Sequence, residues 1–253
     1  MRKVNLNYNI SLKKYIIFLK KNKLYHKRKK FFYENNVEKM SNWANVNFEK
    51  TLAWYNKIRK SNKAVVKTIH IENMKKWFYD KKKGVIKHTS GEFFHIEGKR
   101  ILKSDREVKS WDQPFIKQVD YKGGIIGLVR SNIKGIPYYL VDAKYEPGNY
   151  NQIQISPSLQ ATYSNLNRIH EGEKNKVAKK YFSKNYKTIR KFWVTEDGGR
   201  LYLKRNLHWI IQYNGKINLP GKTYRWLTLW ELDKFIKIGS LVGPHLRSIL
   251  SLI

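Results

Sequence analysis

The residues of this sequence that are best suited to chemistry lie in one polar segment, residues 145–167, whose only formally charged side chain is Glu146. The whole chain has 52 Lys and Arg against 19 Asp and Glu, so a general basic bias does not explain a neutral stretch. Its polar side chains are amides and hydroxyls, which donate and accept hydrogen bonds without a fixed charge and therefore suit the hydroxyl groups of a sugar. A polar loop network that only stabilises turns is the alternative interpretation.

The local sequence predicts that Glu146 lies at the end of a strand. Pro147 disfavours helix at the preceding residue, and the pair Pro147-Gly148 suits the central positions of a type II turn. Residues 152–155 then alternate Gln with Ile, which predicts a strand with both Ile side chains on the core face and both Gln side chains on the opposite face.

The elements that must position this segment form an α+β pattern. Short β-prone runs between Gly and Pro residues predict strands near 92–96, 115–119, 124–129, 138–141, 152–155, 201–203 and 209–213. Apolar residues at helical spacing predict helices near 11–21, 41–58, 69–79 and 229–237, the last behind a capping box formed by Thr228 and Glu231. We therefore expect an α+β domain with a mixed or antiparallel sheet and flanking helices.

The formal net charge of +33 has two interpretations. Clustered Lys and Arg bind nucleic-acid phosphates, whereas a generally basic composition gives only a solvated surface. Residues 1–40 hold twelve Lys or Arg against two Glu, and the remaining excess is spread along residues 41–253, so we do not expect a nucleic-acid partner. We interpret residues 1–40 as a basic, helical N-terminal appendage and residues 41–253 as one module. The appendage either contacts a membrane surface or another anionic partner, or packs on its own domain.

Several classes of protein are disfavoured by what the sequence lacks. It contains no Cys, so disulfides and thiolate chemistry are excluded, and a reducing, cytoplasmic setting fits best. No apolar run approaches the roughly 18 residues that span a bilayer. The seven His show no paired metal-ligand spacing, and residues 123–127 lack the spacing of a dinucleotide-binding glycine motif. We therefore expect no metal ion.

Several motifs, the first of them in the neutral segment, occur in a characteristic order. They are Tyr145-Glu-Pro-Gly-Asn149, Gln154-Ile-Ser-Pro-Ser-Leu-Gln-Ala-Thr162, Ser164-Asn165, Arg168-Ile-His170, His88-Thr-Ser-Gly-Glu-Phe-Phe94, Trp111-Asp-Gln-Pro114, Gly124-Ile-Ile-Gly127, Lys204-Arg-Asn206 and Tyr224-Arg-Trp226. Together they resemble the NDP-hexose 2,3-dehydratase family over roughly residues 41–253. The resemblance implies a Nudix-like fold without the acidic Nudix box.

The resemblance also implies an activity. Family members act on nucleoside-diphosphate 4-keto-6-deoxyhexoses, usually thymidine-linked, and eliminate water across C2 and C3 in deoxysugar biosynthesis. No cofactor is expected, because the C4 ketone acidifies the C3 proton. The protein must supply a base at C3, donors for the C4 enolate and an acid for the leaving C2 hydroxyl.

The resemblance assigns candidate residues to these roles. Glu146 is the expected base and His170 the expected acid, with Tyr163 as the competing acid. The expected substrate-binding residues are Trp111, Gln113, Lys144, Asn149, Gln160, Thr162, Asn165, Arg168, Arg205, Arg225 and Trp226. Within that group the arginines suit a diphosphate, since a guanidinium can pair two oxygens, and the tryptophans suit the base, although a core role is the alternative for both.

One departure from the family concerns copy number. Family members typically carry two tandem copies of this module, whereas this sequence contains one. A second identical chain would supply the missing half, which predicts a symmetric homodimer. The alternatives are a catalytically inactive sugar-nucleotide-binding module, or a basic nucleic-acid-associated protein that reuses the fold.

Overall fold

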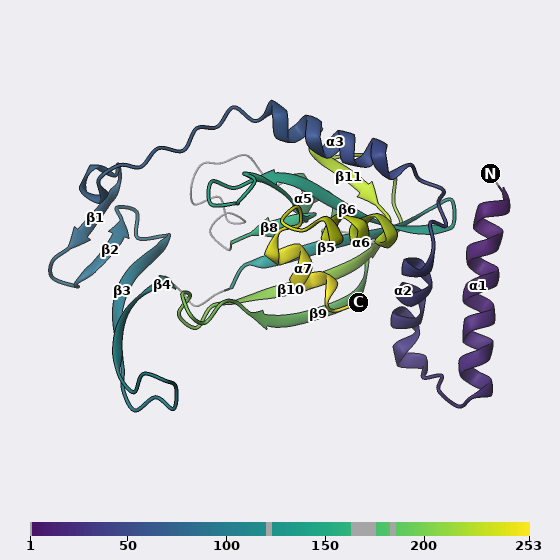
Figure 1. The fold of residues 1–253 in the computed structure, drawn as a ribbon, viewed down its shortest axis with the longest axis horizontal. Coiled ribbons are helices and arrows are strands. Elements are labelled where there is room, and N and C mark those ends of the chain that lie inside the picture. Colours follow the sequence, from purple (N-terminus) through teal and green to yellow (C-terminus); the bar gives the residue numbers. More distant parts are fainter. Residues whose placement is uncertain (1, 120–122, 163–175, 183–185) are drawn as a thin grey trace.

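A computed structural model of the protein describes residues 2–119, 123–162, 176–182 and 186–253 (Figure 1). Its centre is a seven-stranded sheet with the order β11-β6-β5-β10-β9, in which β7 also pairs with β6 and β8 with β5. The strands are β5 (Ile125–Ile133), β6 (Ile136–Tyr145), β7 (Ile153–Pro157), β8 (Leu159–Ala161), β9 (Tyr186–Thr195), β10 (Arg205–Tyr213) and β11 (Tyr224–Leu227). All pairs are antiparallel except β5 with β10, so the predicted α+β class with a mixed sheet is confirmed.

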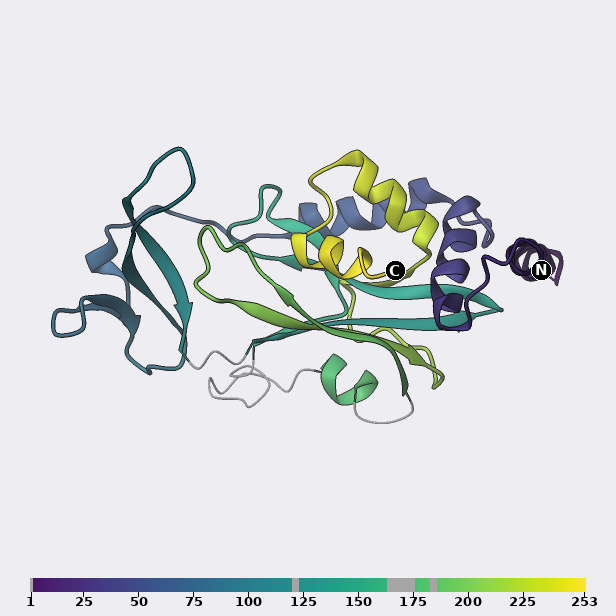
Figure 2. The same cartoon turned by 90° about the horizontal axis from the view of Figure 1, so that it is seen from below.

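Helices cover both faces of this sheet because its strands alternate apolar side chains between two cores. On β5, Ile126 and Leu128 belong to one buried cluster and Val129 to the other. The first cluster lies under α3 (Phe48–Ser61), α6 (Leu229–Ile238) and α7 (Pro244–Leu250), and the second lies against α5 (Lys176–Tyr181) (Figure 2). The predicted capping box of α6 is confirmed, with the side chains of Thr228 and Glu231 each accepting from the other's backbone N–H.

A separate four-stranded antiparallel sheet lies at one end of the molecule (Figure 1). Its strands are β1 (Trp77–Asp80), β2 (Val85–His88), β3 (Phe94–Ile101) and β4 (Trp111–Gln118). The Ile116 N–H donates to the Arg200 carbonyl at 2.9 Å, and the Tyr202 N–H donates to the Ile116 carbonyl at 2.9 Å. These bonds tie β4 to the connection between β9 and β10.

Three local predictions are wrong. Residues 69–79 form only a short 3-10 turn, η2 (Ile71–Asn73), before β1, since the aromatic residues 77–79 pair with β2 instead of continuing a helix. Residues 201–203 lie in the β9–β10 connection, where Leu203 has a φ of 51°. Gly148 lacks the positive φ that a type II turn requires at its third position, and the turn closes instead through the Asn149 N–H and the Glu146 carbonyl at 3.0 Å.

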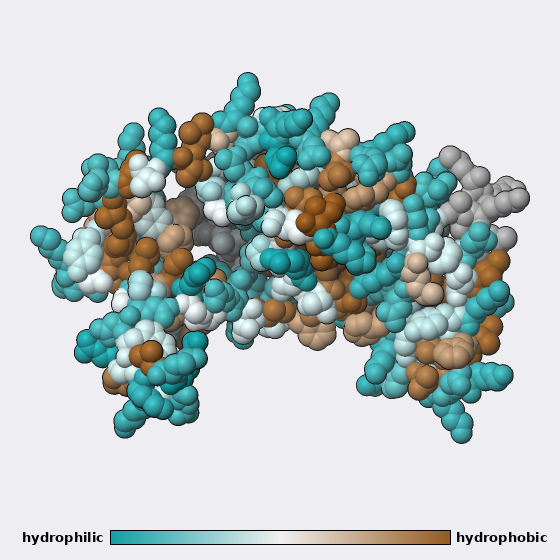
Figure 3. All heavy atoms as spheres, in the orientation of Figure 1, coloured by the Kyte–Doolittle hydropathy of each residue, from teal (hydrophilic) through white to brown (hydrophobic). Residues whose placement is uncertain are grey.

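The N-terminal residues form two helices, α1 (Arg2–Lys21) and α2 (Lys30–Met40), joined through η1 (Lys27–Lys29). The sequence pattern predicted the C-terminal half of α1 but not α2. In this hairpin α1 packs on α2, and α2 packs on α6 and on the seven-stranded sheet. Figure 3 shows apolar side chains between hydrophilic ones at the edge formed by α1. Within the described ranges, no helix is both long and apolar enough to cross a lipid bilayer.

Candidate active site

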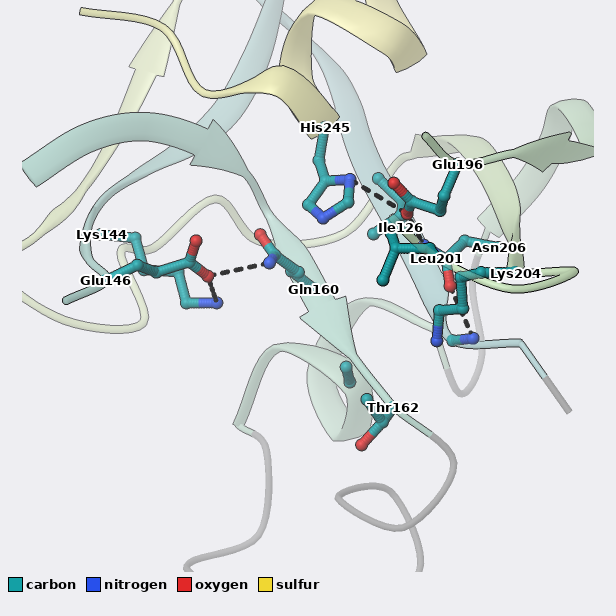
Figure 4. A pocket seen from close by; sticks show the side chains of 12 residues that line it. Ile126, Lys144, Glu146, Gln160, Thr162, Glu196, Leu201, Lys204, Asn206 and His245 are labelled. Carbon is teal, nitrogen blue, oxygen red and sulfur yellow. Dashed lines mark hydrogen bonds and ion pairs between the residues drawn. The ribbon is translucent and has the colours of Figure 1, made fainter. Parts of the chain in front are cut away.

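A cavity of about 330 Å³ opens at the end of the seven-stranded sheet that faces the small sheet (Figure 4). Several elements contribute to its wall: the start of β5, the end of β6, β8, the β9–β10 connection and the first turn of α7. Its lining residues are Gly124, Ile126, Lys144, Glu146, Gln160, Ala161, Thr162, Glu196, Leu201, Lys204, Asn206 and His245. The cavity therefore places two carboxylates, an imidazole, two amides and two ammonium groups around one volume.

Glu146 follows directly after β6, as the sequence predicted. The strand ends there because Pro147 has no N–H to continue the ladder, and the Glu146 N–H donates to the Gln152 carbonyl at 3.0 Å. The carboxylate accepts from Lys144 Nζ and Gln160 Nε2, each at 2.9 Å and each through Oε1. Among the described residues, no side chain or N–H donates to Oε2. Figure 4 shows these three side chains together on one side of the cavity.

The opposite wall contains the second carboxylate, Glu196. The β9–β10 connection positions it, because the Glu196 N–H donates to the Lys204 carbonyl at 3.0 Å. Its Oε1 accepts from Asn206 Nδ2 and lies 3.5 Å from His245 Nδ1. Figure 4 shows the imidazole pointing from α7 toward Glu196, across the cavity from Glu146. A carboxylate next to one imidazole nitrogen fixes the orientation of the ring.

Asn206 is buried and connects this wall to the floor of the cavity. Its Oδ1 accepts from the Gly124 N–H at 2.8 Å, so the amide is held at both ends. A Cβ on Gly124 would lie 2.7 Å from the Ala161 carbonyl oxygen and 3.1 Å from Asn206 Oδ1. Only glycine therefore allows β5, β8 and β10 to approach so closely at this point.

A more apolar hollow of about 290 Å³ adjoins the cavity and shares Thr162, Leu201 and Lys204 with it. Its apolar lining consists of Phe94 on β3, the preceding Phe93, Ile116 on β4, and Leu201. Lys204 stands at the junction, where its Nζ donates to Gln118 Oε1 and burial lowers the pKa of its ammonium group. Together the two volumes form a cleft with a polar half and an apolar half.

The structure brings some of the predicted site residues together. Glu146, Lys144, Gln160 and Thr162 line the cavity. Asn149 contributes its N–H to the turn after Glu146. Four further predicted residues lie outside the described residues: Tyr163, Asn165, Arg168 and His170.

Other predicted residues lie elsewhere in the described part of the chain. Trp111 and Gln113 are on β4, where Trp111 Nε1 donates to Gln113 Oε1 at 3.0 Å and Gln113 Nε2 donates to the Gly199 carbonyl. The Arg205 guanidinium stacks 4.7 Å from the Trp193 ring, and that of Arg225 lies 5.4 Å from the Trp54 ring. Trp226 packs against the second core cluster. The substrate-binding roles of these residues stay predictions.

Sequence reasoning did not single out Glu196, Lys204, Asn206 or His245. Lys204-Arg-Asn206 belongs to a family-like motif, but only Arg205 was given a role. Glu196 and His245 are 49 positions apart in the sequence, and only the fold brings them together. A glutamate before a turn and a histidine in the first turn of a helix are common, so their local patterns predict no site.

Comparisons with known proteins agree with the motifs. A family model described as NDP-hexose 2,3-dehydratase matches residues 48–253. A relative from Streptomyces violaceoruber is 27% identical over 205 residues, which cover 79% of this chain and 45% of the relative. One from Amycolatopsis orientalis is 30% identical over 210 residues, covering 80% and 44%. Both are named dTDP-4-dehydro-6-deoxy-alpha-D-glucopyranose 2,3-dehydratase. The chain thus spans less than half the length of these relatives.

Two solved structures also align with the chain. A Nudix hydrolase from M. smegmatis, RenU, aligns at 13% identity and a TM-score of 0.33, over 61% of this chain and 97% of the hydrolase. The C. elegans Ap4A hydrolase aligns at 14% identity and a TM-score of 0.30, over 55% of this chain and 98% of that protein. The match of the family model across residues 48–253 covers most of the sequence, and the chain therefore belongs to the NDP-hexose 2,3-dehydratase family.

Proposed function

We propose that this chain removes water across C2 and C3 of a nucleoside-diphosphate 4-keto-6-deoxyhexose, with a dTDP-linked sugar as the substrate. The observation that carries the proposal is the arrangement around Glu146. Its carboxylate lines a polar cavity of about 330 Å³ and is held through Oε1 by Lys144 and Gln160, whereas no described residue donates to Oε2. Membership in the family supports dehydration as the reaction, and the geometry around Glu146 supports this carboxylate as the base that removes a proton.

The proposed reaction begins with removal of the C3 proton. The C4 ketone acidifies this proton, because the electron pair left by the C–H bond delocalises onto the ketone oxygen as an enolate. Glu146 accepts the proton through Oε2. Lys144 Nζ, 2.9 Å from Glu146 Oε1, is a cation next to the same carboxylate and is placed to stabilise the developing negative charge.

The second step expels the C2 hydroxyl. The enolate electrons re-form the C4 ketone and create the C2–C3 double bond, while an acid protonates the leaving oxygen to give water. The resulting C3 enol then becomes a ketone. His170 is the acid expected from the sequence, with Tyr163 as the alternative, whereas the contact of 3.5 Å between Glu196 and His245 supports His245. Separate substitution of each residue distinguishes these three assignments.

The nucleoside half of the substrate is proposed to occupy the apolar hollow. The rings of Phe93 and Phe94 can stack on the nucleobase. Lys204 lines both volumes and therefore lies between the proposed positions of the sugar and the nucleobase, where the diphosphate would bind. Arg168, Arg205 and Arg225 remain candidates for further contacts with the phosphates.

We also propose that two copies of the module associate as a symmetric homodimer. The support is that residues 48–253 match the family model once, while the part of each of two relatives that aligns with this chain is only 45% and 44% of that relative. Sedimentation equilibrium measures the mass directly. A mass of twice the 30.3 kDa chain is expected, and a monomer that turns over substrate would contradict the proposal.

The test of function is turnover of dTDP-4-keto-6-deoxyglucose by the full chain, followed through loss of the C2 oxygen. Glu146→Gln keeps the size of the side chain but removes its basicity, and we expect kcat to fall about 10³-fold with little change in the substrate Kd. Glu107→Gln, at a side chain that is 87% exposed, is the matched control and should behave as wild type. Binding of substrate without turnover by wild type would identify an inactive module instead.

A further inference from the structure

Helix α1 has two apolar stripes on opposite sides. The inner stripe packs on α2: Tyr8 and Leu19 are 3% and 6% exposed, and the Tyr15 ring lies 6.2 Å from that of Tyr33. At roughly 100° per residue, Ile10 and Ile17 lie about half a turn away from this stripe, and they are 41% and 54% exposed. Packing within the protein therefore accounts for the inner stripe but not for the outer one.

Lysines border the outer stripe on both of its sides. Lys13 and Lys20 lie on one side and Lys14 and Lys21 on the other, each pair seven residues or about two turns apart. All four are exposed, although Lys20 Nζ is also 5.3 Å from the Tyr25 ring. We define the outer face of α1 as Ile10, Lys13, Lys14, Ile17, Lys20 and Lys21.

We propose that the outer face of α1 binds an anionic lipid surface. A helix that lies in a membrane interface buries its apolar side chains among the acyl chains, while flanking lysines extend their ammonium groups to the lipid phosphates. The outer face has this arrangement, with two apolar side chains between two lysine pairs. Each lysine near an anionic surface adds attraction, and the neighbouring basic residues 27–30 add further positive charge.

The same features argue against the two competing partners. A second copy of this chain would place the four lysines opposite another set of lysines, and like charges repel. A nucleic acid would engage the lysines through its phosphates but would leave Ile10 and Ile17 in water. Exposed apolar side chains between lysines therefore favour a partner with both negative charge and an apolar interior.

The position of α1 is compatible with simultaneous catalysis. Figures 1 and 2 place α1 at one end of the molecule and the small sheet, beside the cavity, at the other. The inner stripe fixes α1 on α2, and α2 is fixed to the sheet by the pair of Glu38 and Arg130 at 2.7 Å. Docking through the outer face would leave the cleft open to a soluble sugar nucleotide, so membrane binding and turnover are separable.

The test is co-sedimentation of the full chain with vesicles of equal molar phosphatidylcholine and phosphatidylglycerol, compared with phosphatidylcholine alone. We expect binding to the anionic vesicles only, weakened by added salt as the lysine charges are screened. Ile10→Gln/Ile17→Gln keeps the charge and the helix propensity, and should lower the binding constant roughly tenfold. Val65→Gln/Val66→Gln, at side chains 78% and 58% exposed outside α1, is the matched control and should bind as wild type.

Three results would overturn the proposal. They are no binding of wild type to anionic vesicles, equal binding by Ile10→Gln/Ile17→Gln, and preference of wild type for a single-stranded oligonucleotide over vesicles at the same salt concentration. Far-UV circular dichroism checks the fold of each variant. Lys14→Gln/Lys21→Gln removes two positive charges from the outer face of α1 and keeps its apolar side chains. This variant should also lose binding to anionic vesicles. Dehydration kinetics of all these variants in the absence of lipid should equal those of wild type.

Discussion

The two ends of the seven-stranded sheet contain similar ionisable residues in different surroundings. At the end facing the small sheet, Glu146 and Glu196 face a cavity. Toward the other end, Arg130 on β5 is 6% exposed and donates to Glu38 Oε1 and to Gln212 Oε1, each at 2.7 Å. Glu38 also accepts from Tyr139 at 3.1 Å, so the charges at this end are paired within the fold.

Burial and pairing thus separate the charges that stabilise the fold from those that line a cavity. Burial raises the pKa of Glu38, and the Arg130 guanidinium opposes that shift. Both side chains of this pair are buried, with Glu38 4% and Arg130 6% exposed, so the pair is not accessible to a substrate. At the cavity, by contrast, the Glu146 side chain is 37% exposed. We therefore expect substitutions at one end to change the free energy of unfolding and at the other to change turnover.

The largest expected effect on stability is that of Arg130→Met. Removing one partner leaves Glu38 buried without its cation, which costs about 3–5 kcal/mol of unfolding free energy, measured by urea denaturation. The double variant Arg130→Met/Glu38→Met should recover most of this loss, because no unpaired charge remains. An unchanged urea midpoint for Arg130→Met would contradict a stabilising role of this pair. A fall in kcat of the folded variant would contradict the separation of stability from turnover at the two ends of the sheet.

Next in size are Glu196→Gln and His245→Gln at the cavity. Each should lower kcat about a hundredfold while the urea midpoint stays near that of wild type. If Glu196 acts by orienting His245, the double variant should be little worse than either single variant, because the two residues act as a unit. Independent, multiplying losses would show that the contact of 3.5 Å between them has no role in catalysis.

A smaller effect is expected in the apolar hollow. Phe94→Ala should raise the Kd of dTDP by roughly threefold to tenfold, since an aromatic stacking contact contributes about 0.5–1.5 kcal/mol. Isothermal titration measures this change. Phe78→Ala is the matched control, because Phe78 is similarly exposed on β1 but lies outside the lining of this hollow. If both variants bind dTDP with equal affinity, the nucleobase does not bind in this hollow.

The smallest effect concerns His208, a buried residue behind the cavity wall. Its Nε2 lies 3.1 Å from Ser248 Oγ of α7, and burial lowers the pKa of its imidazole below the ordinary value of 6.5. As the pH falls through 6.5, this histidine takes up a proton in the unfolded chain before it does so in the native protein. The free energy of unfolding therefore decreases with falling pH, by at most about 1.4 kcal/mol per pH unit. His208→Gln should reduce this slope, and the exposed His70→Gln should not.

The sequence predicted those features that depend on neighbouring residues. Glu146 at a strand end and the capping box of α6 are local patterns, and the structure contains them. The alternation of residues 152–155 is confirmed only for Ile153 and Ile155, which lie in the core, because β7 begins at Ile153, Gln152 has a φ of 59° outside the strand, and Gln154 is buried. The predicted helix over residues 69–79 failed, because pairing with β2 outweighs helical spacing of apolar residues. Glu196 and His245 could not be predicted, since only the packing of α7 against the sheet brings them together.

The assignment of Glu146 as the base that removes the C3 proton of a sugar nucleotide is tested with dTDP-4-keto-6-deoxyglucose deuterated at C3. We expect wild type to release this deuterium to solvent as the C2 oxygen is lost. Glu146→Gln should bind the same substrate with an unchanged Kd and release almost no deuterium. Deuterium release by Glu146→Gln at the wild-type rate would contradict the assignment of Glu146 as the base.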